Sequence, residues 1–256
     1  MQLKYGLKKE WMEFFCTKRW LAFVIPAVVF VFLDPLTVMA MPLLMEALPA
    51  DLGLDGLKEL YTASQAMALQ SFCSDFSQMG MLALLLAMMR TAGGDQKNKS
   101  CVMPICNGFR RGTYVLSKFI VYPAAAFVIS ILAYLAAYAF SWFLFEDRVG
   151  FGSILLPLLA FGLFLAFAAA LMLTLGCITG KGGISAIIVF ILFTFVSMFL
   201  SALNLNRYNP LALLNMAGSF ERFDLPEYGL TALITLAAGI LLCLLTMGAF
   251  QKKRLV

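Results

Sequence analysis

Two carboxylates, Asp34 and Asp75, stand within long apolar stretches of this 256-residue sequence. A charged side chain at the centre of a membrane helix costs about 2.5–3.5 kcal/mol on insertion scales, so such residues usually face protein or a water-filled cavity. The chemistry that these residues suggest is the binding of an ion or solute along a translocation path. The alternative is that both lie near the outer membrane surface and have only a structural role.

Other kinds of chemistry are excluded by composition. The sequence contains no histidine, the commonest general base and metal ligand, so His-dependent triads and His-containing metal sites are absent. Of six cysteines, only Cys101 and Cys106 are close, and a lone Cys-x4-Cys pair makes a poor metal site. An acidic-dyad protease would need Asp34 and Asp75 at similar depth, and no accompanying motif supports one. We expect no catalytic residue and no metal site.

The elements that hold these residues are predicted by hydropathy. Hydrophobic residues make up 62% of the chain and charged residues 13%, against about 45–50% and 25% in soluble domains. A membrane-spanning helix takes about 20 mainly apolar residues. We expect an all-α, multi-pass membrane protein with one transmembrane domain over residues 1–256 and six spans, at about residues 20–44, 72–89, 119–145, 154–179, 184–203 and 229–250.

Charge predicts the orientation. With the N-terminus in the cytoplasm, fifteen of the nineteen Lys and Arg residues fall on the inner side, giving +12 inside and −5 outside. A positive-inside bias of this kind predicts that both termini are cytoplasmic. Residues 3–19 are expected to form an amphipathic helix in the headgroup layer, because Leu3, Leu7, Trp11 and Phe14 recur at helical spacing.

The segment at residues 90–118 is long for a connection between membrane helices. It begins with polar residues, continues through Pro104 and enters the third predicted span at Lys118. We interpret it as short surface helices presented to the cytosol; the alternative is a solvated basic loop.

The segment resembles the permease subunits of bacterial type-2 ATP-binding-cassette exporters. The resemblance rests on Asp95-Gln96-Lys97, Met103-Pro104, Arg110-Arg111 and Leu116-Ser117-Lys118-Phe119. It extends to the layout of nearly the whole chain, with an N-terminal interfacial helix, six spans and a structured external segment. By this resemblance the coupling residues toward a cytosolic ATPase would be Asp95, Lys97, Pro104, Arg110, Arg111, Tyr114 and Lys118.

The resemblance implies a dimer, formed with a second copy or a similar permease in the bacterial plasma membrane. The ATPase would be a separate chain, because the nearest approach to a P-loop, Gly176-x3-Gly180-Lys181-Gly182, has the wrong spacing and lacks the following Ser or Thr. ATP and magnesium would bind that partner, and we expect this chain to bind no cofactor and no nucleic acid.

Residues 204–228 form the predicted external segment, with an apolar middle too short to cross a membrane. By resemblance it would gate the outer end of the path through Asn209, Pro210 and Phe220. An ordered cap over the bundle is the alternative.

The expected function is export of an amphipathic or hydrophobic substrate, with peptides as one candidate, because the chain is rich in Phe and Met and has no charged row along any span. The alternative is an ion-gradient-driven carrier that uses Asp34 or Asp75.

Overall fold

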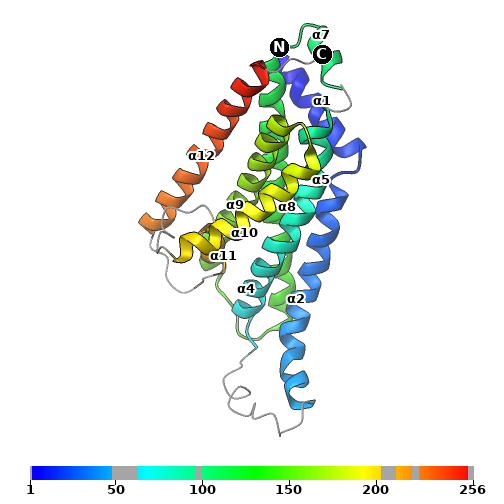
Figure 1. The fold of residues 1–256 in the computed structure, drawn as a ribbon. Coiled ribbons are helices and arrows are strands. Elements are labelled where there is room, and N and C mark those ends of the chain that lie inside the picture. Colours follow the sequence, from blue (N-terminus) through cyan, green and yellow to red (C-terminus); the bar gives the residue numbers. More distant parts are fainter. Residues whose placement is uncertain are drawn as a thin grey trace.

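The computed structural model describes residues 2–47, 63–95, 100–202, 212–218, 220 and 225–252. Every regular element in these ranges is helical, which confirms the predicted all-α class (Figure 1). The elements in chain order are α1 Gln2–Cys16, α2 Leu21–Ala47, α4 Gln65–Asp75, η2 Phe76–Gly80, α5 Met81–Met89, η3 Arg90–Gly94, α7 Val102–Cys106, α8 Arg111–Leu144, α9 Phe151–Thr179, α10 Gly182–Ala202, α11 Ala212–Ala217 and α12 Leu225–Lys252.

Five helical stretches are long and apolar enough to cross a membrane: Leu21–Leu44, Gln65–Met89, Arg111–Leu144, Phe151–Thr179 and Tyr228–Gln251. They match five of the six predicted spans. The remaining predicted span falls on α10, of which Gly182–Phe195 is an apolar helix within the residues whose side chains are described. Apolar side chains such as Leu43 on α2 and Leu233 on α12, each 68% exposed, face outward, as lipid-surrounded helices require.

The helix limits differ from prediction at two places. The second span begins at Gln65 rather than residue 72, because Ser64 caps the helix by accepting a hydrogen bond from the Met67 amide. The third begins at Arg111 rather than residue 119 and continues unbroken through Lys118. Hydropathy does not predict this first part of α8, because its residues are partly polar. Packing against neighbouring helices stabilises it.

The core lies where α8 and α9 meet the second span. Phe72, Phe76, Tyr134 and Phe161 are fully buried and contact one another through their rings, with Phe72 and Phe76 stacked at 5.4 Å between centroids. Pairs of this kind stabilise a core beyond the burial of their area.

One π-helical turn interrupts the second span and another follows its end. The first, η2, follows Asp75 directly, and the second, η3, directly precedes Asp95. Gly80 ends η2 where a Cβ atom would meet the Phe76 ring at 2.7 Å. π turns are rare overall and are found disproportionately at functional sites, so Asp75 and Asp95 are candidate functional residues.

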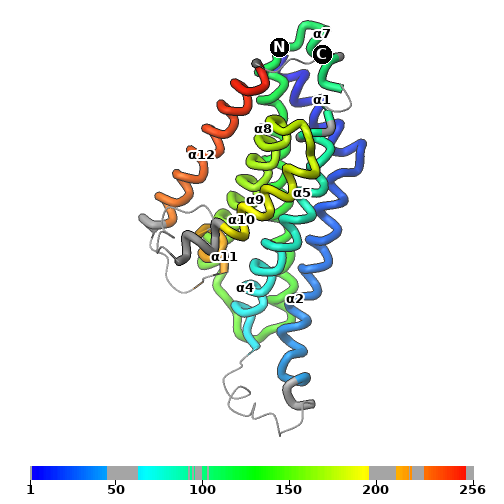
Figure 2. Tube along the Cα trace, viewed as in Figure 1, coloured from blue at the N-terminus to red at the C-terminus, as the bar shows by residue number. Residues whose placement is uncertain are grey.

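The arrangement of the helices places α1, α7 and the end of α12 at one end of the bundle, as Figure 1 shows. Figure 2 shows that α10 runs back along the bundle after α9 and that α12 returns toward the end where α1 lies. The α9–α10 turn closes at Gly180, which has a left-handed φ of 68° that favours glycine. This confirms that the Gly-Lys-Gly sequence there is a turn.

Candidate functional site

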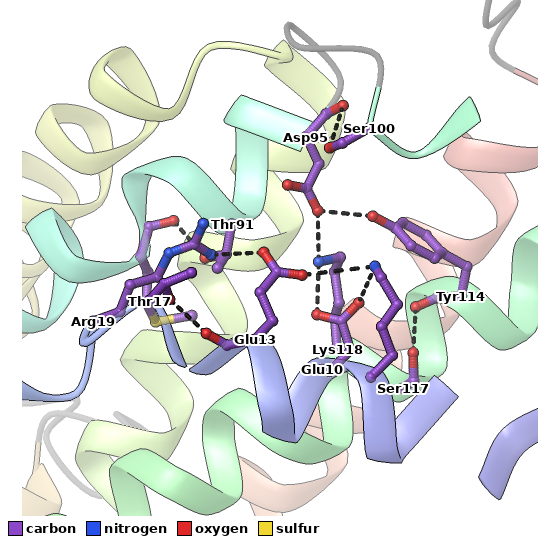
Figure 3. A network of polar contacts seen from close by, with 12 residues as sticks. Glu10, Glu13, Thr17, Arg19, Thr91, Asp95, Ser100, Tyr114, Ser117 and Lys118 are labelled. Atoms are coloured by element: carbon purple, nitrogen blue, oxygen red, sulfur yellow. Dashed lines mark hydrogen bonds and ion pairs between the residues drawn. The ribbon is translucent and has the colours of Figure 1, made fainter. Parts of the chain in front are cut away.

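The most developed polar site lies where α1, the end of η3 and the first turns of α8 meet. We call it the charge cluster and define it by Glu10, Asp95, Tyr114 and Lys118 (Figure 3). Glu10 comes from α1, Asp95 directly follows η3, and Tyr114 and Lys118 are one turn apart on α8. Four residues that lie up to 108 positions apart thus share one site.

Lys118 is the centre of the charge cluster. Its Nζ atom donates to Glu10 Oε2 at 2.8 Å and lies 2.7 Å from Asp95 Oδ2. The Tyr114 hydroxyl donates to the same Asp95 oxygen at 2.7 Å. The Lys118 ammonium also lies 5.0 Å from the centroid of the Tyr114 ring and 5.7 Å from that of Tyr122, which favours the charged form.

The charges of this region are balanced. Lys9 reaches both Glu10 and Glu13, and Arg19 pairs with Glu13 at 3.1 Å. Together with Lys118 and Asp95, the connected network contains three acids and three bases. A buried charge is tolerated when it is paired and hydrogen-bonded, which explains how Glu10 can be fully buried.

Electrostatics keep Asp95 ionised. Burial by itself would raise the pKa of this carboxyl, but the charge and hydrogen bond of Lys118, the hydrogen bond from Tyr114 and the charge of Lys9 hold the pKa below its ordinary value of 3.8. Asp95 is therefore a fixed negative partner at neutral pH.

The close approach of α1 to α8 depends on a glycine. Gly6, Glu10 and Phe14 form the buried face of α1. A Cβ atom on Gly6 would lie 2.9 Å from the Phe109 ring and 3.1 Å from Cβ of Ser117. Trp11 is 50% exposed, so it is free to face lipid, while Glu10 is buried against α8.

The end of α12 belongs to the same region. The Phe250 ring stacks on Tyr114 at 6.0 Å between centroids, and Cys101 and Val115 pack in the same small cluster. Arg111 donates to the carbonyl of Gln251 at 3.1 Å. Helices from the start, middle and end of the chain are therefore joined at this end of the bundle.

The predicted coupling residues divide into two groups. Asp95, Tyr114 and Lys118 come together but are buried, so their side chains are directed into the bundle. Arg110 is exposed, Arg111 is half-buried, and Pro104 lies half-buried in α7. Lys97 lies outside the described residues.

Glu10 is the member that sequence reasoning missed. The signal was available, since an acid follows Gly6 by four residues and precedes Phe14 by four, and these spacings place all three on one helix face.

The second site is the pair formed by Asp34 of α2 and Asp75 of α4, which the structure brings together. Asp34 is 1% exposed and Asp75 is exposed. The Asp34 and Asp75 side chains are close enough to share a hydrogen bond, while Oδ2 of Asp34 is buried with no other hydrogen-bond partner among the described residues. The predicted path residues thus share one location.

The external segment is described only in part. α11 packs on the core through Leu213 and Ala217, and the Ala217 carbonyl accepts from Cys73 Sγ at 3.5 Å and from the Tyr134 hydroxyl at 3.4 Å. Phe220 is partly buried against the same core. Asn209 and Pro210, the other two predicted gate residues, lie outside the described residues.

Two comparisons with known proteins gave no match for this chain. No protein-family model matches it, and no curated protein matches it significantly. Function is therefore argued from the two sites themselves.

Proposed function

We propose that this chain is the membrane-spanning permease subunit of an ATP-binding-cassette exporter, which dimerises and is driven by a separate cytosolic ATPase. In this proposal α10 is the sixth span, and both termini lie in the cytoplasm of a bacterial cell. The positive-inside distribution of Lys and Arg supports the orientation. The location of α1 and the end of α12 at one end of the bundle agrees with it.

The observation that carries the proposal is the charge cluster. A permease driven from outside needs a rigid connection between its cytosolic surface and its spans, because movement is otherwise absorbed by flexible loops. Here Lys118 joins α1, the end of the second span and the start of α8 through two buried ion pairs. A push on this end would therefore move three elements together.

The surface next to the charge cluster supplies a contact for the ATPase. Arg110 is exposed and directly precedes α8, while Cys106, Asn107 and Gly108 form an exposed turn after α7. In the proposal this basic surface docks on the ATPase, and the buried residues Asp95, Tyr114 and Lys118 transmit the movement. The predicted coupling segment thus has an outer, contacting part and an inner, connecting part.

An apolar cargo is supported by a groove of about 260 Å³ between α8, α9 and α12. Its lining includes Phe119, Leu163, Phe167 and Leu236, and the small residues Ala166 and Gly239 leave room between the helices. A groove of this composition suits an apolar or amphipathic molecule.

The test is reconstitution with a cognate ATPase, to be sought among the genes next to the one that encodes this chain. Wild-type permease is expected to co-purify with the ATPase and to stimulate ATP hydrolysis in lipid vesicles. Arg110→Glu is expected to lower association at least about tenfold, which is the effect of losing a strong charged contact and adding a repulsive one. Lys4→Glu reverses an exposed charge on α1 at the same end of the bundle and is the matched control. Absence of association with the wild-type chain would reject the proposal.

A second candidate is a carrier driven by an ion gradient, and the Asp34–Asp75 pair favours it because membrane carboxylates carry protons in many transporters. It requires transport by the permease alone in vesicles that hold an ion gradient and no ATP. Asp34→Asn would abolish that transport.

A further inference from the structure

The Asp34–Asp75 pair contains a buried acid without a base. Asp34 Oδ2 is buried and has no hydrogen-bond partner within the described part of the chain, although its residue is only 1% exposed. Thr37 does not supply one, because its hydroxyl donates to the backbone carbonyl of Asp34 at 2.7 Å. An unpaired buried carboxylate is costly, so this oxygen is placed to receive a donor that the described residues lack.

Asp75 opens the pair to the outside. It is exposed on the second span. A charged or polar group on a membrane-crossing helix must meet water or a polar partner, since hydrocarbon cannot hydrogen-bond to it. The buried acid therefore lies next to an exposed carboxyl that a polar group can reach.

The surroundings are apolar apart from this face. Phe30 of α2 and Phe76 of η2 contact each other at 6.4 Å between ring centroids, each close in sequence to one acid of the pair. One turn further along α2, Val38 packs with Ala68 and Phe145, near the beginning of α4 and the end of α8. The pair thus lies near the middle of α2 and of the second span.

The required donor is a cation that makes hydrogen bonds. Two acids that share a hydrogen bond hold one proton between them, and a bound cation would replace this proton, balance both carboxylates and give Asp34 Oδ2 a donor. An inorganic divalent ion is a poor fit, because such ions take six or more oxygen ligands and no group of three or more metal-binding side chains occurs among the described residues. A guanidinium or primary ammonium group carries several donors and suits two carboxyls.

We propose that Asp34 and Asp75 together bind the guanidinium or primary ammonium group of an amphipathic organic cation. The apolar part of the ligand lies against the neighbouring aromatic and aliphatic side chains. As a step in export this site rests on the proposed function, in which it lies along the path. Binding of the cation to the pair does not depend on the proposed function.

The experiment measures binding to the purified chain in nanodiscs of zwitterionic lipid, with no ATPase present. The probes are octylguanidinium and octylurea, which have similar planar heads and equal chains but differ in charge. Wild-type protein is expected to prefer octylguanidinium by at least about tenfold, the value of one charge-assisted hydrogen bond. Asp75→Asn, at an exposed position where folding is not at stake, and Asp34→Asn should each remove most of this preference. Glu146→Gln, which removes an exposed acid just after α8, should leave it intact.

Full preference in Asp75→Asn, or an equal loss in Glu146→Gln, would overturn the site. Displacement of the probe by millimolar sodium or calcium at constant ionic strength would assign the pair to an inorganic ion and would also overturn the proposal. Because the assay contains no ATPase, a failed ATPase association leaves its result unchanged, and the two proposals can fail separately.

Discussion

The charge cluster and the Asp34–Asp75 pair each contain a buried acid, and they differ in what surrounds it. Glu10 is fully buried against Lys118, within a network in which acids and bases are equal in number. Asp34 is as deeply buried, but the charged group acting on it is another acid. The first arrangement joins α1 to α8 through an ion pair. The second lacks a positive partner, which the proposed organic cation would supply. Burial of an acid thus accompanies a structural contact in the charge cluster and a candidate binding site at the Asp34–Asp75 pair.

The largest loss of folding stability is expected for Lys118→Met. Removing the ammonium leaves Asp95 without an ion-pair partner among the described residues and leaves Glu10 with the part-exposed Lys9 alone, and breaking a buried pair in this way costs about 3–5 kcal/mol. The measurement is the free energy of unfolding in mixed micelles, followed by tryptophan fluorescence, since Trp11 lies on α1 and reports its release.

Two variants complete this prediction. Lys4→Met removes an exposed lysine from α1 and should change stability by no more than about 0.5 kcal/mol. The triple variant Lys118→Met, Glu10→Gln, Asp95→Asn should recover most of the loss, because no unpaired charge remains. If the triple variant were as unstable as Lys118→Met alone, the loss would be one of packing rather than of charge.

An intermediate effect is expected for Tyr114→Phe. The hydroxyl donates to ionised Asp95 at 2.7 Å, and a hydrogen bond to a charged group contributes about 1.5–3 kcal/mol. The ring remains to stack on Phe250, so the change isolates the hydroxyl. Stability measured in the Asp95→Asn background tests the assignment, since the effect of Tyr114→Phe should shrink there. If Tyr114→Phe lowered stability equally in the wild-type and Asp95→Asn backgrounds, the effect of the hydroxyl would not depend on the Asp95 carboxylate.

The smallest effect on stability is expected for Asp34→Asn, which is the sharpest contrast with the charge cluster. No hydrogen bond to Oδ2 is lost, and the repulsion from Asp75 is relieved, so stability should stay within about 1 kcal/mol of wild type or rise. Thermal unfolding of the same nanodisc samples used for binding measures it. A loss of about 3 kcal/mol or more would show that Asp34, like Glu10, has a partner that stabilises the fold.

Much of the fold follows from local sequence. Five predicted spans match helices that are long and apolar enough to cross a membrane, because about 20 apolar residues in a row have few other stable states. The turn at Gly180 was predictable for a similar reason, since glycine takes a positive φ without strain. The extra helical turns before residue 119 were not predicted, because the residues that stabilise them lie on α1, η3 and α12.

The candidate sites, too, were predictable in part from local sequence and in part only from the tertiary structure. The prediction singled out Asp95, Tyr114 and Lys118 as neighbours in sequence, and they are indeed neighbours in space. It treated all three as a surface, whereas the structure buries them against Glu10, a residue too distant in sequence to be linked to them by spacing.

The sequence alone determined the all-helical class, the apolar helices and the identity of the exceptional acids, because each depends on residue type and short-range periodicity. Only the tertiary structure decided that Glu10 meets Lys118 and that Asp34 meets Asp75. The cost or benefit of a buried charge depends on the sign of its neighbour, and neighbours on different helices are chosen by packing rather than by distance along the chain.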